Sequence, residues 1–117
     1  MGLSTHVLDT MHGQPASGLQ VALYETHGEA STLVKRLVLN EDGRNPDGPL
    51  LDSASLHAGT YRLSFDVAAY FRGKGVALPE PPFLDQVHID FGVADPAAHY
   101  HVPLLVSPWS YSTYRGS

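Results

Sequence analysis

Cysteine is missing from this 117-residue sequence. Without it, disulfide bonds, thiol nucleophiles and thiolate-bound metals are excluded, so any chemistry has to rest on other side chains. The absence fits a reducing or an oxidising compartment equally well and does not choose between them.

Positive charge is also scarce. Seven Lys and Arg stand against twelve Asp and Glu, which gives a formal net charge of −5. Apart from the neighbours Lys35 and Arg36, the basic residues are scattered singly along the chain. Nucleic acids and anionic membranes both require clustered positive charge, so we expect neither as a partner.

Long apolar runs are absent too. No stretch approaches the ~20 apolar residues that a transmembrane helix needs. Residues 1–6 lack the basic region, apolar segment and cleavage site of a secretion signal, and the last residues are not a peroxisomal address. We therefore expect a cytoplasmic protein.

The length of the chain indicates one domain. A chain of this size buries roughly two thirds of its unfolded surface, which is enough for a two-layer core without metals or cross-links. No internal repeat, low-complexity run or linker divides the sequence. We expect residues 1–117 to form a single domain.

Short strands dominate the pattern. Eleven Gly and nine Pro separate segments in which apolar and polar residues alternate, as in half-buried strands. The segments with this character are residues 3–9, 19–25, 31–39, 61–66, 87–93 and 100–106, and residues 67–73 fit a short helix. These elements predict an all-β sandwich of seven to eight strands with one short helix. Pro103 cannot donate a ladder hydrogen bond, which predicts an edge position or a bulge where the pairing breaks.

Histidine is abundant, with seven residues. His99 and His101 lie two apart in an expected strand, so both side chains point away from its apolar face, toward solvent or another subunit. His6 lies in the first expected strand. Arg44 follows a glycine in a loop, and its guanidinium can bind planar carbonyl or carboxylate groups through two parallel hydrogen bonds.

Three interpretations of these groups remain open. His-x-His on a strand together with a third histidine is a zinc-ligand pattern. Neutral imidazoles, whose unperturbed pKa is about 6.5, suit general acid–base hydrolysis. The third interpretation is a solvated sheet face whose histidines do no chemistry. The zinc interpretation is weakened because no Asp or Glu lies in the strand of His99 and His101 to orient the ligands.

The C-terminal residues are polar. Residues 112–117 are nearly all hydrogen-bonding groups, and the chain's own carboxylate follows them. Chain ends usually fray unless something holds them. Because this segment follows the strand of His101 closely, we expect it to form part of a site.

Two segments together resemble the transthyretin-like family. Residues 6–9 (His-Val-Leu-Asp), 13–16 (Gly-Gln-Pro-Ala) and 19–21 are similar to its N-terminal signature, and residues 100–112 resemble its C-terminal signature. The enzymes of this family, the 5-hydroxyisourate hydrolases, have a histidine in each motif, an Asp-Gly-Arg between them and a terminal Tyr-Arg-Gly-Ser. This chain has the matching residues His6, Asp42-Gly43-Arg44, His101 and Tyr114-Arg115-Gly116-Ser117. The hormone-carrying transthyretins lose this set.

The departures from the enzyme pattern are small. Trp109-Ser110 stands where many of the enzymes have an aromatic residue followed by glycine. The residues Asn45-Pro46-Asp47 give the loop after Arg44 a sequence particular to this chain. Neither departure removes a reacting group.

The resemblance implies hydrolysis of 5-hydroxyisourate to 2-oxo-4-hydroxy-4-carboxy-5-ureidoimidazoline in urate degradation, without a metal or an organic cofactor. The catalytic residues that it implies are His6, Arg44, His101 and Ser117. The substrate-binding residues that it implies are His6, Arg44, Tyr114 and Arg115. It also implies a homotetramer with active sites at the dimer–dimer interface, where the outward histidines and the polar terminus become buried. The alternative is a non-catalytic transthyretin-like carrier of a small molecule.

Overall fold

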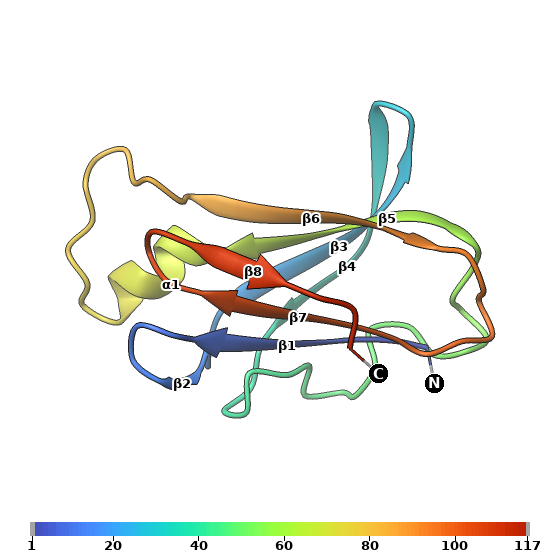
Figure 1. Ribbon diagram of the computed structural model, residues 1–117, viewed down its shortest axis with the longest axis horizontal. Coiled ribbons are helices and arrows are strands. Elements are labelled where there is room, and N and C mark those ends of the chain that lie inside the picture. Colours follow the sequence, from blue (N-terminus) through green and yellow to red (C-terminus); the bar gives the residue numbers. More distant parts are fainter. Residues whose placement is uncertain (1, 117) are drawn as a thin grey trace.

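Residues 2–116 are described by a computed structural model, in which two four-stranded sheets pack face to face (Figure 1). The first sheet has the order β2-β1-β7-β8 and consists of β1 (Leu3–Asp9), β2 (Gln14–Pro15), β7 (Tyr100–Val106) and β8 (Tyr111–Thr113). The second has the order β4-β3-β5-β6 and consists of β3 (Gln20–His27), β4 (Ala30–Val38), β5 (Gly59–Asp66) and β6 (Gln86–Val93). A short helix, α1 (Val67–Gly73), follows β5. The predicted β-sandwich with a short helix is confirmed.

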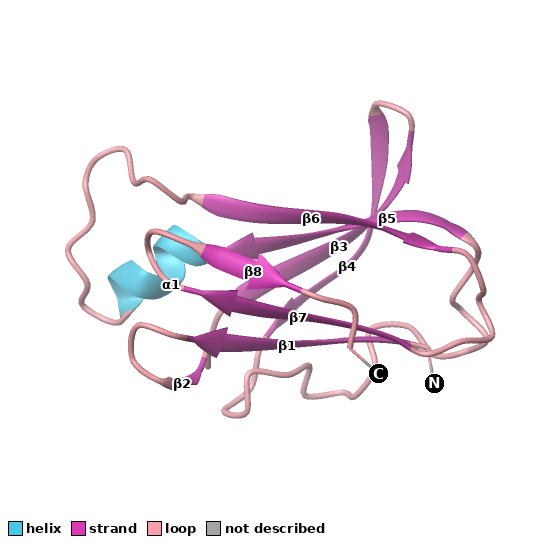
Figure 2. Cartoon of the chain, viewed as in Figure 1, coloured by secondary structure: helices cyan, strands magenta, loops and turns pink. Residues whose placement is uncertain are grey.

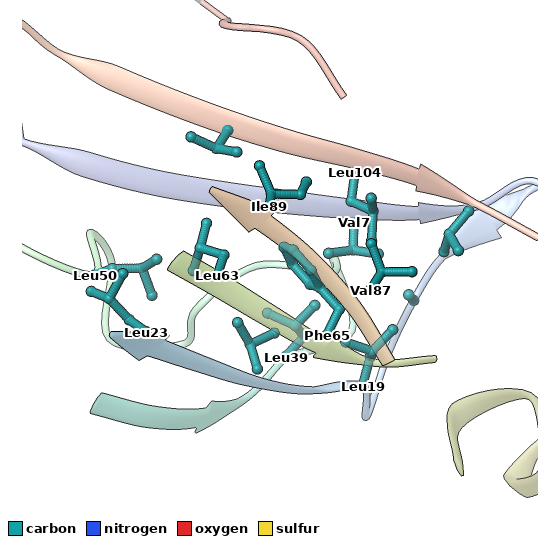
Figure 3. Close-up of a cluster of buried hydrophobic side chains, with 14 of the residues drawn as sticks. Val7, Leu19, Leu23, Leu39, Leu50, Leu63, Phe65, Val87, Ile89 and Leu104 are labelled. Carbon is teal, nitrogen blue, oxygen red and sulfur yellow. The ribbon is translucent and has the colours of Figure 1, made fainter. Parts of the chain in front are cut away.

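The core lies between the two sheets, where alternate strand residues point inward (Figure 3). Val7 of β1 and Leu104 of β7 are fully buried and belong to the same cluster as Leu63 and Phe65 of β5. Each such side chain contributes roughly 1.5–3 kcal/mol when it is removed from water. Because strand residues alternate between faces, the burial of these positions directs their neighbours on β1 and β7 to the outer face.

Strands β1 and β7 run parallel in the middle of the first sheet. Their register places Ser4 beside His101 and His6 beside Pro103. On the other side of β7, the antiparallel ladder with β8 covers only the last three residues of β7, and a separate bridge joins His101 to Gly116. Pro103 lies in the gap between the two, although its pairing with His6 of β1 is unbroken. The strand is thus an interior one, and the pairing at Pro103 breaks on the β8 side only.

Helix α1 lies at one end of the sandwich (Figure 2). Tyr70 and Phe71 are buried in the core and anchor the helix to the sheets. The helix ends at Gly73, and Gly75 has a φ of 83°, a left-handed conformation in which glycine is favoured. No helix in residues 2–116 is long and apolar enough to cross a membrane.

A buried carboxylate joins α1 to the turn after β1. Asp9 is fully buried, and its side chain accepts hydrogen bonds from the Tyr70 hydroxyl (2.8 Å), His12 Nδ1 (2.6 Å) and the His12 backbone N–H (3.0 Å). Burial by itself would raise the pKa of Asp9, but the hydrogen bonds from His12 and Tyr70 outweigh it and hold this pKa below its ordinary value. The end of β1 is therefore fixed by a charged group inside the fold.

Candidate active site

His6 and His101 lie on the outward face of the first sheet, on the neighbouring strands β1 and β7. Both are half-buried, whereas Thr5 and Val102, which alternate with them, point into the core and are buried. The strand alternation therefore delivers both histidines to the same face, as the sequence predicts for His101.

The loop that contains Arg44 runs along β1 where the short strand β2, which pairs only with Leu8 and Asp9, leaves its edge unpaired. The Val7 N–H donates to the Gly43 carbonyl at 3.0 Å, and an isolated bridge pairs His6 with Arg44. Gly43 has a φ of 71°, and a Cβ at this position would lie 2.4 Å from the Val7 carbonyl oxygen. Glycine is therefore required between Asp42 and Arg44, because it lets the loop approach β1 closely enough to set the arginine beside His6.

Asn40 holds the arginine turn in shape. Its Oδ1 accepts hydrogen bonds from the backbone N–H groups of Asp42 (2.9 Å) and Arg44 (3.1 Å), and its own N–H donates to the Arg44 carbonyl at 2.8 Å. The sequence analysis did not single out Asn40. The signal was present, because asparagine before a polar turn commonly forms this kind of side-chain-to-backbone bond.

Burial and the nearby positive charge of Arg44 both favour the neutral form of the two histidines. Burial and the nearby Arg44 guanidinium lower the pKa of His6, against opposition from the backbone and carboxylate of Asp42. Burial, Arg44, His6 and His99 lower the pKa of His101. A neutral imidazole has a free lone pair and can act as a base, so this arrangement offers two candidate bases near the positive charge of the exposed Arg44.

His101 is held on several sides. Ser4 Oγ lies 2.8 Å from its Nδ1, and the His99 ring stacks on it with a centroid separation of 6.4 Å and an interplanar angle of 11°. The Gly116 N–H donates to the His101 carbonyl at 2.8 Å. The sequence analysis missed Ser4 as a contact, because strand pairing, and hence the identity of a cross-strand neighbour, is not visible in one strand's pattern.

His99 contributes a ring face and an unsatisfied nitrogen. Its Nδ1 is the only buried side-chain nitrogen or oxygen in residues 2–116 without a hydrogen-bond partner. A buried polar atom without a partner destabilises a fold, and such atoms gather at functional sites.

The C-terminal residues are placed only in part. The Arg115 guanidinium lies 4.1 Å from the centroid of the Tyr100 ring and donates a hydrogen bond to the His99 carbonyl at 3.3 Å. Tyr114 is 61% exposed. Ser117, which the sequence analysis placed in the site, lies outside the described residues. Within residues 2–116, the predicted residues that the structure brings together are His6, Arg44 and His101.

Two further features bear on what this face could bind. Among residues 2–116, no three His, Asp or Glu side chains are arranged to hold a metal ion, so the zinc interpretation gains no support. One cavity of ≈ 210 Å³ lies along β3, β4 and β5, and another of ≈ 440 Å³ lies near His27 and His57. Neither is lined by His6, Arg44 or His101, whose face of the sheet is open in the single chain.

Comparison with known proteins places the chain in a family. Residues 3–116 match the model of the HIUase/Transthyretin family. A protein of Deinococcus radiodurans named 5-hydroxyisourate hydrolase is 55% identical, over 99% of this chain and 96% of the relative. A protein of Rhizobium meliloti named 5-hydroxyisourate hydrolase 2 is 54% identical, over 98% of this chain and 95% of the relative.

Solved structures are also similar to the chain. The chain is similar to (S)-allantoin synthase (TM-score 0.93, 45% identity), covering 99% of this chain but only 43% of that one, so it spans less than half of that protein's length. It is similar to the 5-hydroxyisourate hydrolase of Klebsiella pneumoniae over the whole of both chains (TM-score 0.80, 37% identity). Sea bream transthyretin in complex with thyroxine matches with a TM-score of 0.85 and 28% identity, over 99% of this chain and 95% of that one. The chain belongs to the HIUase/Transthyretin family.

Proposed function

We propose that this chain is a 5-hydroxyisourate hydrolase, which opens the ring of its substrate by adding water across an acyl carbon–nitrogen bond. One observation supports this most strongly. His6, Arg44 and His101 meet on one sheet face, in a chain more than half identical over almost its whole length to proteins named for this activity.

The reaction needs three groups, and we assign each of them to residues of this site. A base must remove a proton from the attacking water, a donor must stabilise the oxyanion that forms, and an acid must protonate the leaving nitrogen. His6 and His101 position and deprotonate the water, and one of them returns the proton to the nitrogen. Acid–base help of this kind contributes about 10²–10⁴-fold.

Arg44 serves the site in two ways. Its guanidinium holds the substrate carbonyls and stabilises the charge that grows on the oxygen. Burial lowers the pKa of His6 and of His101, and the positive charge of Arg44 lowers it further, which favours the neutral form that can accept a proton.

The terminal residues complete the proposal. Tyr114 forms part of the pocket wall, and Arg115 secures the segment by its contacts with Tyr100 and His99 while it also lines the pocket. Ser117 orients a histidine or the water; this role rests on the resemblance of the terminal Tyr-Arg-Gly-Ser to the enzymes.

The site is completed by assembly into a homotetramer, with the histidine face at the dimer–dimer interface. Two features support this. His6 and His101 are only half-buried in the single chain. Several large apolar side chains are also exposed, in the loop before β6 and from the turn after β7 onward: Phe83, Trp109, Tyr111 and Tyr114. Exposed groups of this kind mark association surfaces. Sedimentation analysis should give four times the mass of the chain, and a stable monomer with full activity would contradict the proposal.

The rival function is that of a small-molecule carrier, as in the thyroxine-bound sea bream protein. A carrier needs no pair of neutral histidines beside an arginine. The test measures the ultraviolet absorbance of 5-hydroxyisourate generated from urate by urate oxidase. We expect the protein to accelerate its decay. Tight thyroxine binding without acceleration would assign the chain to the carriers.

A further inference from the structure

Ser4 is the nearest polar neighbour of His101 on the outward sheet face. The parallel register of β1 and β7 sets the two residues side by side, and Ser4 Oγ lies 2.8 Å from His101 Nδ1. Ser4 is two residues from His6 on the same strand face, so one strand supplies both a proposed reacting group and the partner of the other.

This contact divides the two ring nitrogens of His101 between two tasks. Nδ1 is occupied by Ser4, which leaves Nε2 for water or substrate. In a neutral imidazole one nitrogen has the proton and the other has the lone pair, and the hydrogen bond made by one decides the state of the other. A hydroxyl can accept or donate, so both directions are chemically allowed.

We propose that Ser4 is a positioning residue of the hydrolase, which accepts a hydrogen bond from His101 Nδ1–H and so presents the Nε2 lone pair to the attacking water. The inference rests on the proposed function. Water gives its proton to Nε2 while its oxygen bonds to the acyl carbon. As the carbon–nitrogen bond breaks, Nε2–H passes this proton to the leaving nitrogen. The Nδ1–H to Ser4 bond persists throughout.

A hydroxyl suits this position better than a carboxylate does. A carboxylate would also orient the ring, but its negative charge would favour the protonated imidazole and raise the pKa of His101. At this site burial, Arg44, His6 and His99 all act in the opposite direction. Ser4 therefore fixes the tautomer without adding a charge that would oppose the neutral form.

The chain has a matched control on its other sheet. Ser64 Oγ lies 2.7 Å from His88 Nδ1, and these residues pair between β5 and β6 on the outward face of the second sheet. The chemistry and geometry of this pair resemble those of Ser4 and His101, but it lies on the opposite sheet from His6 and Arg44. Ser64→Ala should leave hydrolysis unchanged.

The kinetic test compares Ser4→Ala, Ser4→Thr and Ser64→Ala in the full-length protein. Loss of one neutral hydrogen bond should lower the kcat/KM of Ser4→Ala by roughly 2- to 10-fold. Ser4→Thr keeps the hydroxyl and should recover most of that loss. Wild-type kcat/KM in a folded Ser4→Ala protein, or an equal loss in Ser64→Ala, would overturn the proposal.

The second readout is the tautomer itself. ¹⁵N NMR of the wild-type protein at neutral pH should show His101 Nδ1 protonated and Nε2 unprotonated, and in Ser4→Ala the two tautomers should mix. An unprotonated Nδ1 in the wild type would overturn the proposal even if the variant does not fold. If the wild type does not hydrolyse 5-hydroxyisourate, the proposed function fails. The NMR spectra then still show, independently of activity, whether His101 Nδ1 is protonated and donates to Ser4.

Discussion

Substitution of Gly116 by alanine should damage the site without unfolding the protein. Gly116 does not have a positive φ, so the backbone itself accepts an alanine. The added Cβ, however, would lie 2.6 Å from Cδ2 of the His101 ring and 3.2 Å from its Cβ and Cγ. The one consequence of the substitution is therefore pressure on His101.

The size of the effect follows from these distances. An ordinary contact begins at 3.4 Å, so the ring must retreat by about 0.8 Å, which loosens its contact with Ser4. A misplacement of about 1 Å can reduce a rate about 100-fold. We expect Gly116→Ala to lower kcat/KM by roughly 10- to 100-fold, with a loss in unfolding free energy of about 1 kcal/mol, the lower end of the range for an overpacked position.

The assay is the decay of 5-hydroxyisourate, measured beside thermal denaturation of the same samples. Gly73→Ala is the control, because no atom lies within 4 Å of its added Cβ and its φ is not positive. Wild-type kcat/KM in Gly116→Ala, or an equal loss in Gly73→Ala, would refute the reasoning that Gly116 makes room for His101.

Three further predictions concern charge and the terminus. Arg44→Ala should lower kcat/KM by roughly 10²–10³-fold. The substitution also removes one cause of the lowered pKa of His6 and His101, so the acid limb of the pH–rate profile should move to higher pH. An acid limb that does not move would contradict this origin of the pKa shift. Asp9→Asn should destabilise the fold by about 1–3 kcal/mol at pH 7. Because the pKa of Asp9 is lowered in the folded state, its contribution is fully present above the ordinary value of 3.8 and is lost as the pH falls through the folded value. In urea unfolding, the stability deficit of Asp9→Asn should therefore shrink as the pH falls below 3.8, and a constant deficit would disprove the linkage. Deletion of Ser117 should lower activity strongly, and full activity without it would remove the terminus from the mechanism.

Much of the fold could be read from the sequence because its strands alternate cleanly. The segment 100–106 shows this well, since one face is apolar and the other has His101 and Pro103. The bounds of α1 also agree with the expected residues 67–73. These features depend on local periodicity, which a single segment reveals.

The contacts that complete the site could not be read in the same way. The role of Ser4 depends on the parallel register of β1 and β7, whose residues are far apart in the sequence. Asn40 acts on a turn, and Gly116 acts by leaving space beside a ring. His12 bonds to the buried Asp9, a contact that shows only once the turn after β1 is folded. Long-range pairing and steric room are properties of the folded chain and have no local pattern.

The central claim is that the outward histidine face hydrolyses 5-hydroxyisourate. The measurement that tests it most directly is the decay rate of freshly generated 5-hydroxyisourate with equal amounts of wild-type protein and His101→Asn, the latter confirmed as folded. We predict clear acceleration by the wild type and decay close to the spontaneous rate with the variant. Equal acceleration by both proteins would contradict the account, because the chemistry would then lie elsewhere on the molecule.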